Sequence, residues 1–131
     1  MRKDIEIPKV EGVFCAAVNE FNQVHRTQDW NVYLINDKDV PLEMVLIVSR
    51  GYSADKETSL MRHKLEQLPA KSYAKVEFLH EDVLTLNNEF KVTFFEGNTM
   101  FEKTFLFRPN TINLKALQPI PLMQEKGVVV K

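Results

Sequence analysis

The chain has 131 residues, enough for one domain of ordinary size and too few for two independent hydrophobic cores. Its 17 basic and 18 acidic residues leave a net charge of −1 at pH 7. That balance argues against a protein dedicated to nucleic acids or anionic membranes, because phosphate binding draws on an excess of basic side chains. With 44% hydrophobic and 27% charged residues, the composition is typical of a globular protein.

The predicted location is the cytoplasm. The charged start, Met1–Glu6, lacks the apolar run of an export signal, and the longest apolar run, Met44–Val48, is too short to span a membrane. Cys15 is the only cysteine, so no internal disulfide can form and a reducing compartment is expected.

Valine, isoleucine, threonine and the three aromatic residue types supply 40 of the 131 residues, whereas alanine supplies only 6. Such side chains suit pleated strands. In chain order, strands are expected at 13–19, at 30–35 with bulky side chains on both faces, and at 42–48 as a central strand. Because residues 36–41 favour turns, the last two strands are predicted to form a hairpin of about residues 29–49.

Residues 57–68 fit either a short helix or a strand with Met61, His63 and Leu65 on one face, and we favour the strand. Residues 72–79 alternate clearly between apolar and polar side chains, which predicts a further strand. Its inward side chains are expected to be Ala74, Val76 and Phe78.

The clearest hairpin lies between Phe90 and Phe107, a stretch that contains six of the nine phenylalanines. Gly97 stands first in a two-residue loop with Asn98, which indicates a type II′ turn because that position needs a positive φ. This loop places three pairs of residues opposite each other: Phe94 with Phe101, Phe90 with Phe105, and Thr93 with Glu102. The core is therefore expected here.

About seven strands without alternating helices predict an all-β fold, a single-domain antiparallel β-sandwich of immunoglobulin-like or fibronectin-III-like build. The domain is expected to span residues 1–131, with a loosely ordered N-terminal segment 1–10 and a proline-interrupted C-terminal segment 108–131. Val128–Val130 fit a last edge strand. The apolar stretch 114–123 is expected to wrap across one sheet, and the alternative is contact with a second copy in a homo-oligomer.

No local motif carries catalysis, a metal ion or a cofactor. Cys15 has no neighbouring base and is expected to be buried, and no Gly-x-Ser-x-Gly motif occurs. His25, His63 and His80 stand far apart, the acidic run at 36–43 lacks the spacing of a calcium loop, and the four glycines form no phosphate-binding loop. We therefore predict no catalytic residue, no metal ligand and no cofactor.

The polar segment from Ser49 to Lys64 is the best candidate for a binding site. Arginine and tyrosine often anchor protein interfaces, and a β-sandwich presents such loops at its ends. The alternative is an ordinary charged connection between strands. The candidate binding residues are Arg50, Tyr52, Lys56, Arg62 and His63.

These features predict a non-enzymatic interaction or accessory module that binds a protein partner through its end loops or a strand edge. The first alternative is an enzyme whose site forms only in three dimensions, with Asp29, His63, Glu77 and His80 as participants. The second is an RNA-associated protein that uses residues 50–64, against which the nearly neutral charge argues.

Several segments resemble a group of small bacterial proteins: Trp30–Asn36, Pro41–Glu43, Val45–Ser49, Leu68–Ser72, Leu86–Phe90 and Glu125–Val128. Some members of that group carry the label phenylalanyl-tRNA synthetase alpha subunit. The resemblance implies a bacterial cytosolic protein and carries no site residue. The sequence does not support that label, because a class II synthetase needs a catalytic domain that 131 mostly strand-forming residues cannot supply.

Overall fold

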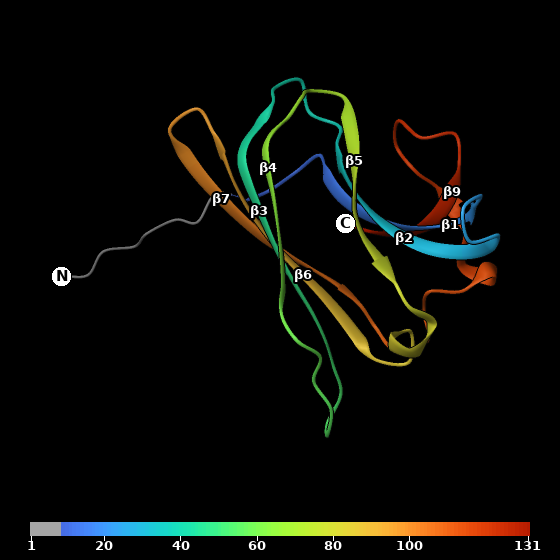
Figure 1. Ribbon diagram of the computed structural model, residues 1–131. Helices are drawn as coiled ribbons and strands as arrows, with labels where there is room; N and C mark the ends of the chain where they lie inside the picture. Colours follow the sequence, from blue (N-terminus) through green and yellow to red (C-terminus); the bar gives the residue numbers. More distant parts are fainter. Residues whose placement is uncertain (1–8) are drawn as a thin grey trace.

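The computed structural model describes residues 9–131 and shows two antiparallel sheets packed face to face (Figure 1). The described residues form nine strands: β1 (Val13–Asn22), β2 (Thr27–Asn36), β3 (Leu42–Tyr52), β4 (Met61–Leu68), β5 (Ser72–Leu79), β6 (Asn87–Glu96), β7 (Thr99–Phe107), β8 (Gln118–Pro119) and β9 (Lys126–Val130). The first sheet has the order β5-β2-β1-β9-β8 and the second the order β4-β3-β6-β7. Two short 3₁₀ helices, η1 (Glu81–Val83) and η2 (Leu114–Ala116), lie in connections. The predicted all-β sandwich is confirmed.

The C-terminal segment accounts for the two strands beyond the expected seven. Val128–Val130 belong to β9, but this strand is not at an edge, because it pairs with β1 on one side and with β8 on the other. The ambiguous segment 57–68 contains strand β4, so the strand favoured from the sequence is confirmed.

The hairpin predicted over residues 29–49 is wrong, because β2 and β3 lie in different sheets. Residues 37–41 carry the chain from the first sheet to the second instead of turning it back. Asn36, fully buried at the start of this crossing, fixes it in place. Its side-chain amide donates to three backbone carbonyl oxygens, those of Val40, Leu68 and Pro69, at 3.0, 3.2 and 3.0 Å.

The hairpin of β6 and β7 has the predicted register. Phe94 pairs with Phe101, Phe90 with Phe105, and Thr93 with Glu102. Gly97 has a φ of 63°, as the first position of the two-residue turn requires. On the core side, the Phe94 and Phe101 rings are in direct contact and stack with their centroids 5.3 Å apart.

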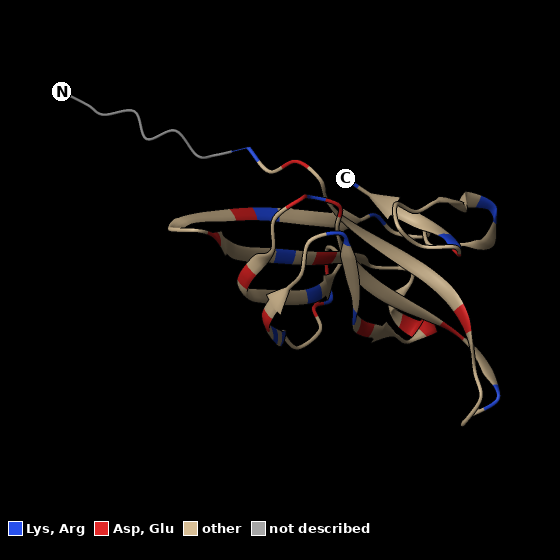
Figure 2. Cartoon of the chain, turned by 90° about the horizontal axis from the view of Figure 1, so that it is seen from above, with Lys and Arg blue, Asp and Glu red and all other residues tan. Residues whose placement is uncertain are grey.

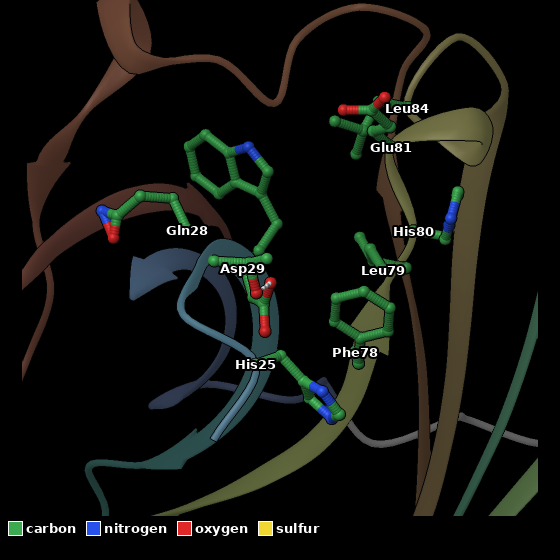
Figure 3. Close-up of a pocket in the computed structure, with 10 residues that line it drawn as sticks. His25, Gln28, Asp29, Phe78, Leu79, His80, Glu81 and Leu84 are labelled. Carbon is green, nitrogen blue, oxygen red and sulfur yellow. Dashed lines mark hydrogen bonds between the residues drawn. The ribbon is translucent and has the colours of Figure 1, made fainter. Parts of the chain in front are cut away.

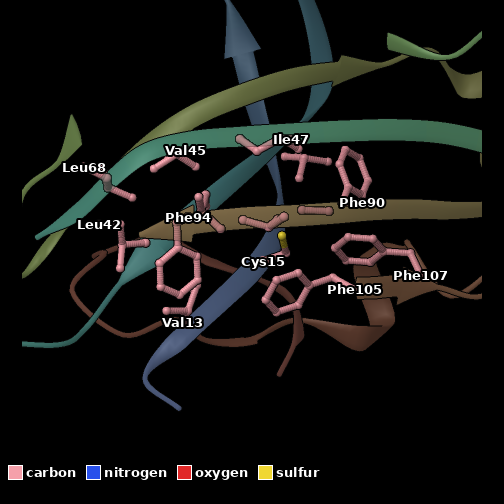
Figure 4. Close-up of a cluster of buried hydrophobic side chains, with 14 of the residues drawn as sticks. Val13, Cys15, Leu42, Val45, Ile47, Leu68, Phe90, Phe94, Phe105 and Phe107 are labelled. Atoms are coloured by element: carbon pink, nitrogen blue, oxygen red, sulfur yellow. The ribbon is translucent and has the colours of Figure 1, made fainter. Parts of the chain in front are cut away.

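The main core lies between the two sheets, where Phe90, Phe94, Phe105 and Phe107 are fully buried (Figure 4). Cys15 belongs to the same cluster, as expected for a thiol without a catalytic partner. Burial raises the pKa of the Cys15 thiol, because the charged thiolate would lose its hydration. This cysteine is therefore a packing residue.

A second, smaller cluster lies on the outer face of the first sheet. Ile120 of the C-terminal segment is buried there against Val18 and Ile35, with Met123 packed beside it. Of the apolar stretch 114–123, Ile120 and Met123 thus cover this face of the sheet, whereas Leu114, Leu117 and Leu122 are exposed. Of the N-terminal segment predicted to be loose, residues 1–8 lie outside the described residues, and Val10 is buried in the main core.

Basic and acidic residues are interspersed over strands and loops alike, in keeping with the balanced composition (Figure 2). Over residues 9–131, no helix has the length and apolar character needed to cross a membrane.

Candidate functional site

The two ends of the sandwich differ in their connections. One end carries the loops 23–26, 53–60 and 80–86, and we call it the arm end because residues 53–60, the arm, project from it (Figure 1). The other end, called the closed end, carries the links 37–41 and 69–71 and the β6–β7 turn. The candidate site lies at the arm end.

Arg50, a predicted binding residue, is committed to contacts within the chain. Its guanidinium donates to Glu57 at 3.1 Å and to Glu89 at 3.3 Å. It also lies over the Tyr52 ring, 4.4 Å from the centroid, which is cation–π geometry. Because Glu57 belongs to the arm and Glu89 to β6, Arg50 and Tyr52 together hold the base of the arm against the second sheet.

The other three predicted binding residues divide in two. Lys56 and Arg62 are exposed, and neither forms an ion pair with another of the residues that the structure describes. His63 turns inward from β4 and contacts Glu77 of β5. Lys56 and Arg62 are therefore accessible on the surface, whereas His63 takes part in a contact inside the sandwich.

A β-bulge in β5 decides which side chains meet inside. Val32 pairs with Glu77 and Tyr33 with Lys75, so Val76 has no opposite residue. The extra residue reverses the alternation beyond it. Glu77 points inward and Phe78 outward, where Phe78 is 51% exposed. The prediction that Phe78 lies inward is wrong for this reason.

Ser49, His63 and Glu77 form a polar network between the two sheets. The Ser49 hydroxyl donates to the Glu77 carboxylate at 2.5 Å, and His63 Nε2 lies 2.8 Å from the same oxygen. Ser49 is 2% exposed and the Glu77 side chain 10% exposed. In a hydrolytic triad the imidazole stands between hydroxyl and carboxylate, whereas here the carboxylate stands between the other two. The network therefore satisfies a buried carboxylate and does not activate the serine.

A cavity of about 280 Å³ opens beside this network, and we call it the arm-side cavity. Thr58, Ser59 and Met61 bound it on the side of the arm. Val83 and Phe90 add apolar surface, and the network supplies its polar part through Ser49 and Glu77.

A second cavity, of about 610 Å³, adjoins the first, and we call it the Trp30 cavity (Figure 3). The two cavities share Phe78, Leu79 and His80 as a common wall. In Figure 3, Asp29 of β2 and Phe78 of β5 lie beside each other, with Glu81 and Leu84 at the upper border and His25 at the lower.

Asp29 is ionised in this cavity. Thr27 and Asn22 donate to its two carboxylate oxygens at 2.8 and 3.0 Å, and these hydrogen bonds lower the pKa of Asp29. On the common wall, the backbone N–H of Asp82 donates to His80 Nδ1 at 3.2 Å, and the same nitrogen lies 3.4 Å from the Asp82 carboxylate.

The four residues named for an enzyme are thus split between two places. His63 and Glu77 meet in the buried network, while Asp29 and His80 line the Trp30 cavity. Sequence reasoning missed the Trp30 cavity, because its walls come from β2, β5 and η1, which are distant along the chain. The only local signal was Trp30 itself, a large aromatic residue near the start of a strand.

Comparison with known proteins assigns no family to this architecture. No family model matches the chain, and no curated protein matches it.

Proposed function

We propose that the chain is a non-enzymatic accessory module that binds a protein partner at the arm end. The observation that carries this proposal is the pair of adjoining cavities beside the arm, bordered by exposed apolar side chains. Phe78, Leu60 and Met61 are each about half exposed, and apolar groups gathered at one end of a rigid scaffold usually mark an interface.

The polar groups of the arm end also favour binding over catalysis. The serine, histidine and carboxylate that come together are bonded to one another, and the serine is buried in the middle of a strand. The nearly neutral net charge of the chain argues against the RNA-associated alternative.

We further propose an immunoglobulin-like classification and a cytoplasmic location. The order of β1, β2 and β5 in one sheet, and of β3, β6 and β7 in the other, corresponds to strands A, B, E and C, F, G of that fold. A free, buried cysteine suits a reducing compartment. The resemblance to a group of small bacterial proteins, and the bacterial origin that it implies, stay predictions from the sequence.

The test is to capture partners from the native cell with the full chain and with Lys56→Glu/Arg62→Glu. These two side chains are exposed and unpaired among the described residues, so the double variant should keep its fold. We expect the double variant to retain at most about one tenth of the partner that the wild type retains, because charge reversal at an interface repels the partner.

The matched control is Lys115→Glu/Lys126→Glu, which makes the same change of charge on the exposed C-terminal segment. It should retain the partner at the wild-type level. If Lys56→Glu/Arg62→Glu retains as much partner as the wild type, and circular dichroism shows that both are folded, the proposal is contradicted.

An enzyme is the second candidate, and one observation favours it: the Trp30 cavity is lined by two histidines and two carboxylates, His25, His80, Asp29 and Glu81. Turnover of an ester, phosphoester or glycoside substrate by the wild type, abolished in Asp29→Asn, would establish this candidate in place of the first.

A further inference from the structure

The aromatic content of the Trp30 cavity is the first clue to its ligand. Trp30 and Phe78 both belong to the lining, and Phe78 is half exposed. At about 610 Å³ the cavity has the size of sites that enclose a small molecule or a long side chain. The negative faces of aromatic rings attract organic cations, and tryptophan does so most strongly.

The charge of the cavity points the same way. Asp29 and Glu81 are the carboxylates of the lining, which includes no lysine or arginine among the described residues; His25 also lines the cavity, and Lys75 lies close enough to Asp29 to lower its pKa. The hydrogen bonds from Thr27 and Asn22 keep Asp29 ionised at neutral pH.

We propose that the Trp30 cavity binds the guanidinium or ammonium group of a basic side chain carried by an extended segment of the partner protein. The proposal rests on the proposed function and specifies the chemistry of the partner. The arm-side cavity supports a segment over a free amine, because it adjoins the Trp30 cavity and offers Met61, Val83 and Phe90 to a neighbouring apolar side chain.

Trp30 is the only tryptophan of the chain, so its fluorescence reports directly on this cavity. The probes are short acetylated and amidated glycine-serine peptides that contain one arginine next to one leucine, in both orders. Matched peptides carry citrulline, which has nearly the shape of arginine without its charge. We expect saturable quenching by an arginine peptide and binding roughly three- to thirtyfold weaker by its citrulline analogue.

Two variants locate the effect. Glu81 lies on an exposed 3₁₀ helix, and Glu81→Gln removes its carboxylate from the cavity. The variant should bind the arginine peptide more weakly by a similar factor and bind the citrulline peptide with unchanged affinity. Glu66→Gln makes the same change on β4 outside both cavities and should leave both peptides unchanged. Circular dichroism confirms the fold of both variants.

Equal affinity of the arginine and citrulline peptides, an unaltered arginine affinity in Glu81→Gln, or no Trp30 response at millimolar peptide would each overturn the inference. Ethylguanidine as a third probe separates the sources: if it binds as tightly as the peptide, the cavity serves a small cation and the docking of a segment is wrong. Partner capture with the Lys56 and Arg62 variant is a separate readout, so a failure of the proposed function is distinguishable from a failure of the cation site.

Discussion

The two ends of the sandwich differ in the interactions that hold their connections in place. At the closed end, short links are fixed by buried and charged groups: Asn36 bonds three carbonyls, Lys38 pairs with Glu96, and Lys71 pairs with Asp37. At the arm end, longer loops leave two cavities and half-exposed apolar side chains such as Phe78.

If the arm end binds the partner as we propose, this difference separates stability from binding in the molecule. At the closed end, Asn36, Lys38 and Lys71 are paired within the chain, and Phe94 stacks on Phe101 beneath the turn. The arm end leaves apolar surface uncovered, and its Lys56 and Arg62 side chains form no ion pair with another described residue. Substitutions at the closed end should therefore act on unfolding, and substitutions at the arm end on binding.

The largest expected effect is that of Phe94→Ala. Phe94 is fully buried near the closed end, and its truncation should lower the free energy of unfolding by about 3–5 kcal/mol, because it removes buried apolar area and leaves a cavity. Urea denaturation followed by circular dichroism measures the change. Met100→Ala on the same hairpin, at a side chain that is 53% exposed, should stay within about 0.5 kcal/mol of the wild type. A similar loss in both variants would refute the placement of the core.

Asn36→Ala should have the next largest effect. It removes the donor to three carbonyl groups at the crossing between sheets, and we expect a loss of about 2–4 kcal/mol because buried acceptors stay unsatisfied. Thermal unfolding measures it, with Asn98→Ala in the exposed β6–β7 turn as control. If Asn36→Ala melts like this control, the crossing does not depend on Asn36.

The smallest effect is a pKa change at the arm end. Thr27→Val removes the strongest hydrogen bond to the Asp29 carboxylate, so the pKa of Asp29 should rise toward its ordinary value of 3.8. A carboxyl group with a lowered folded-state pKa contributes stability above its unfolded pKa and loses that contribution as the pH falls through the folded pKa. The variant should thus differ from the wild type near neutral pH and converge with it in acid. Carbon-13 NMR titration of the carboxyl group checks this, and an unchanged midpoint would contradict the assignment.

Local signals in the sequence were enough for the β6–β7 hairpin. A two-residue loop with Gly97 first leaves one register, so the pairing of Phe94 with Phe101 followed directly. The link of residues 37–41 carried no such constraint, because a loop of that length can return to the same sheet or cross to another. The false hairpin of residues 29–49 came from that ambiguity.

The candidate site was only partly predictable. The exposed basic residues Lys56 and Arg62 follow from a polar loop between strands. The inward position of Glu77 depends on the bulge at Val76, which alternation in the sequence does not reveal. Its contact with Ser49 and His63, and the Trp30 cavity, depend on strands that meet only when both sheets have formed.

The sequence by itself determined the all-β class, the register of the phenylalanine hairpin and the burial of Cys15, because side-chain alternation and turn chemistry act over a few neighbouring residues. Tertiary structure alone decided which sheet each strand joined, which face of β5 carries Glu77, and where the cavities lie. Those outcomes depend on packing between residues far apart in the chain, and each is fixed by the burial that the whole sandwich achieves.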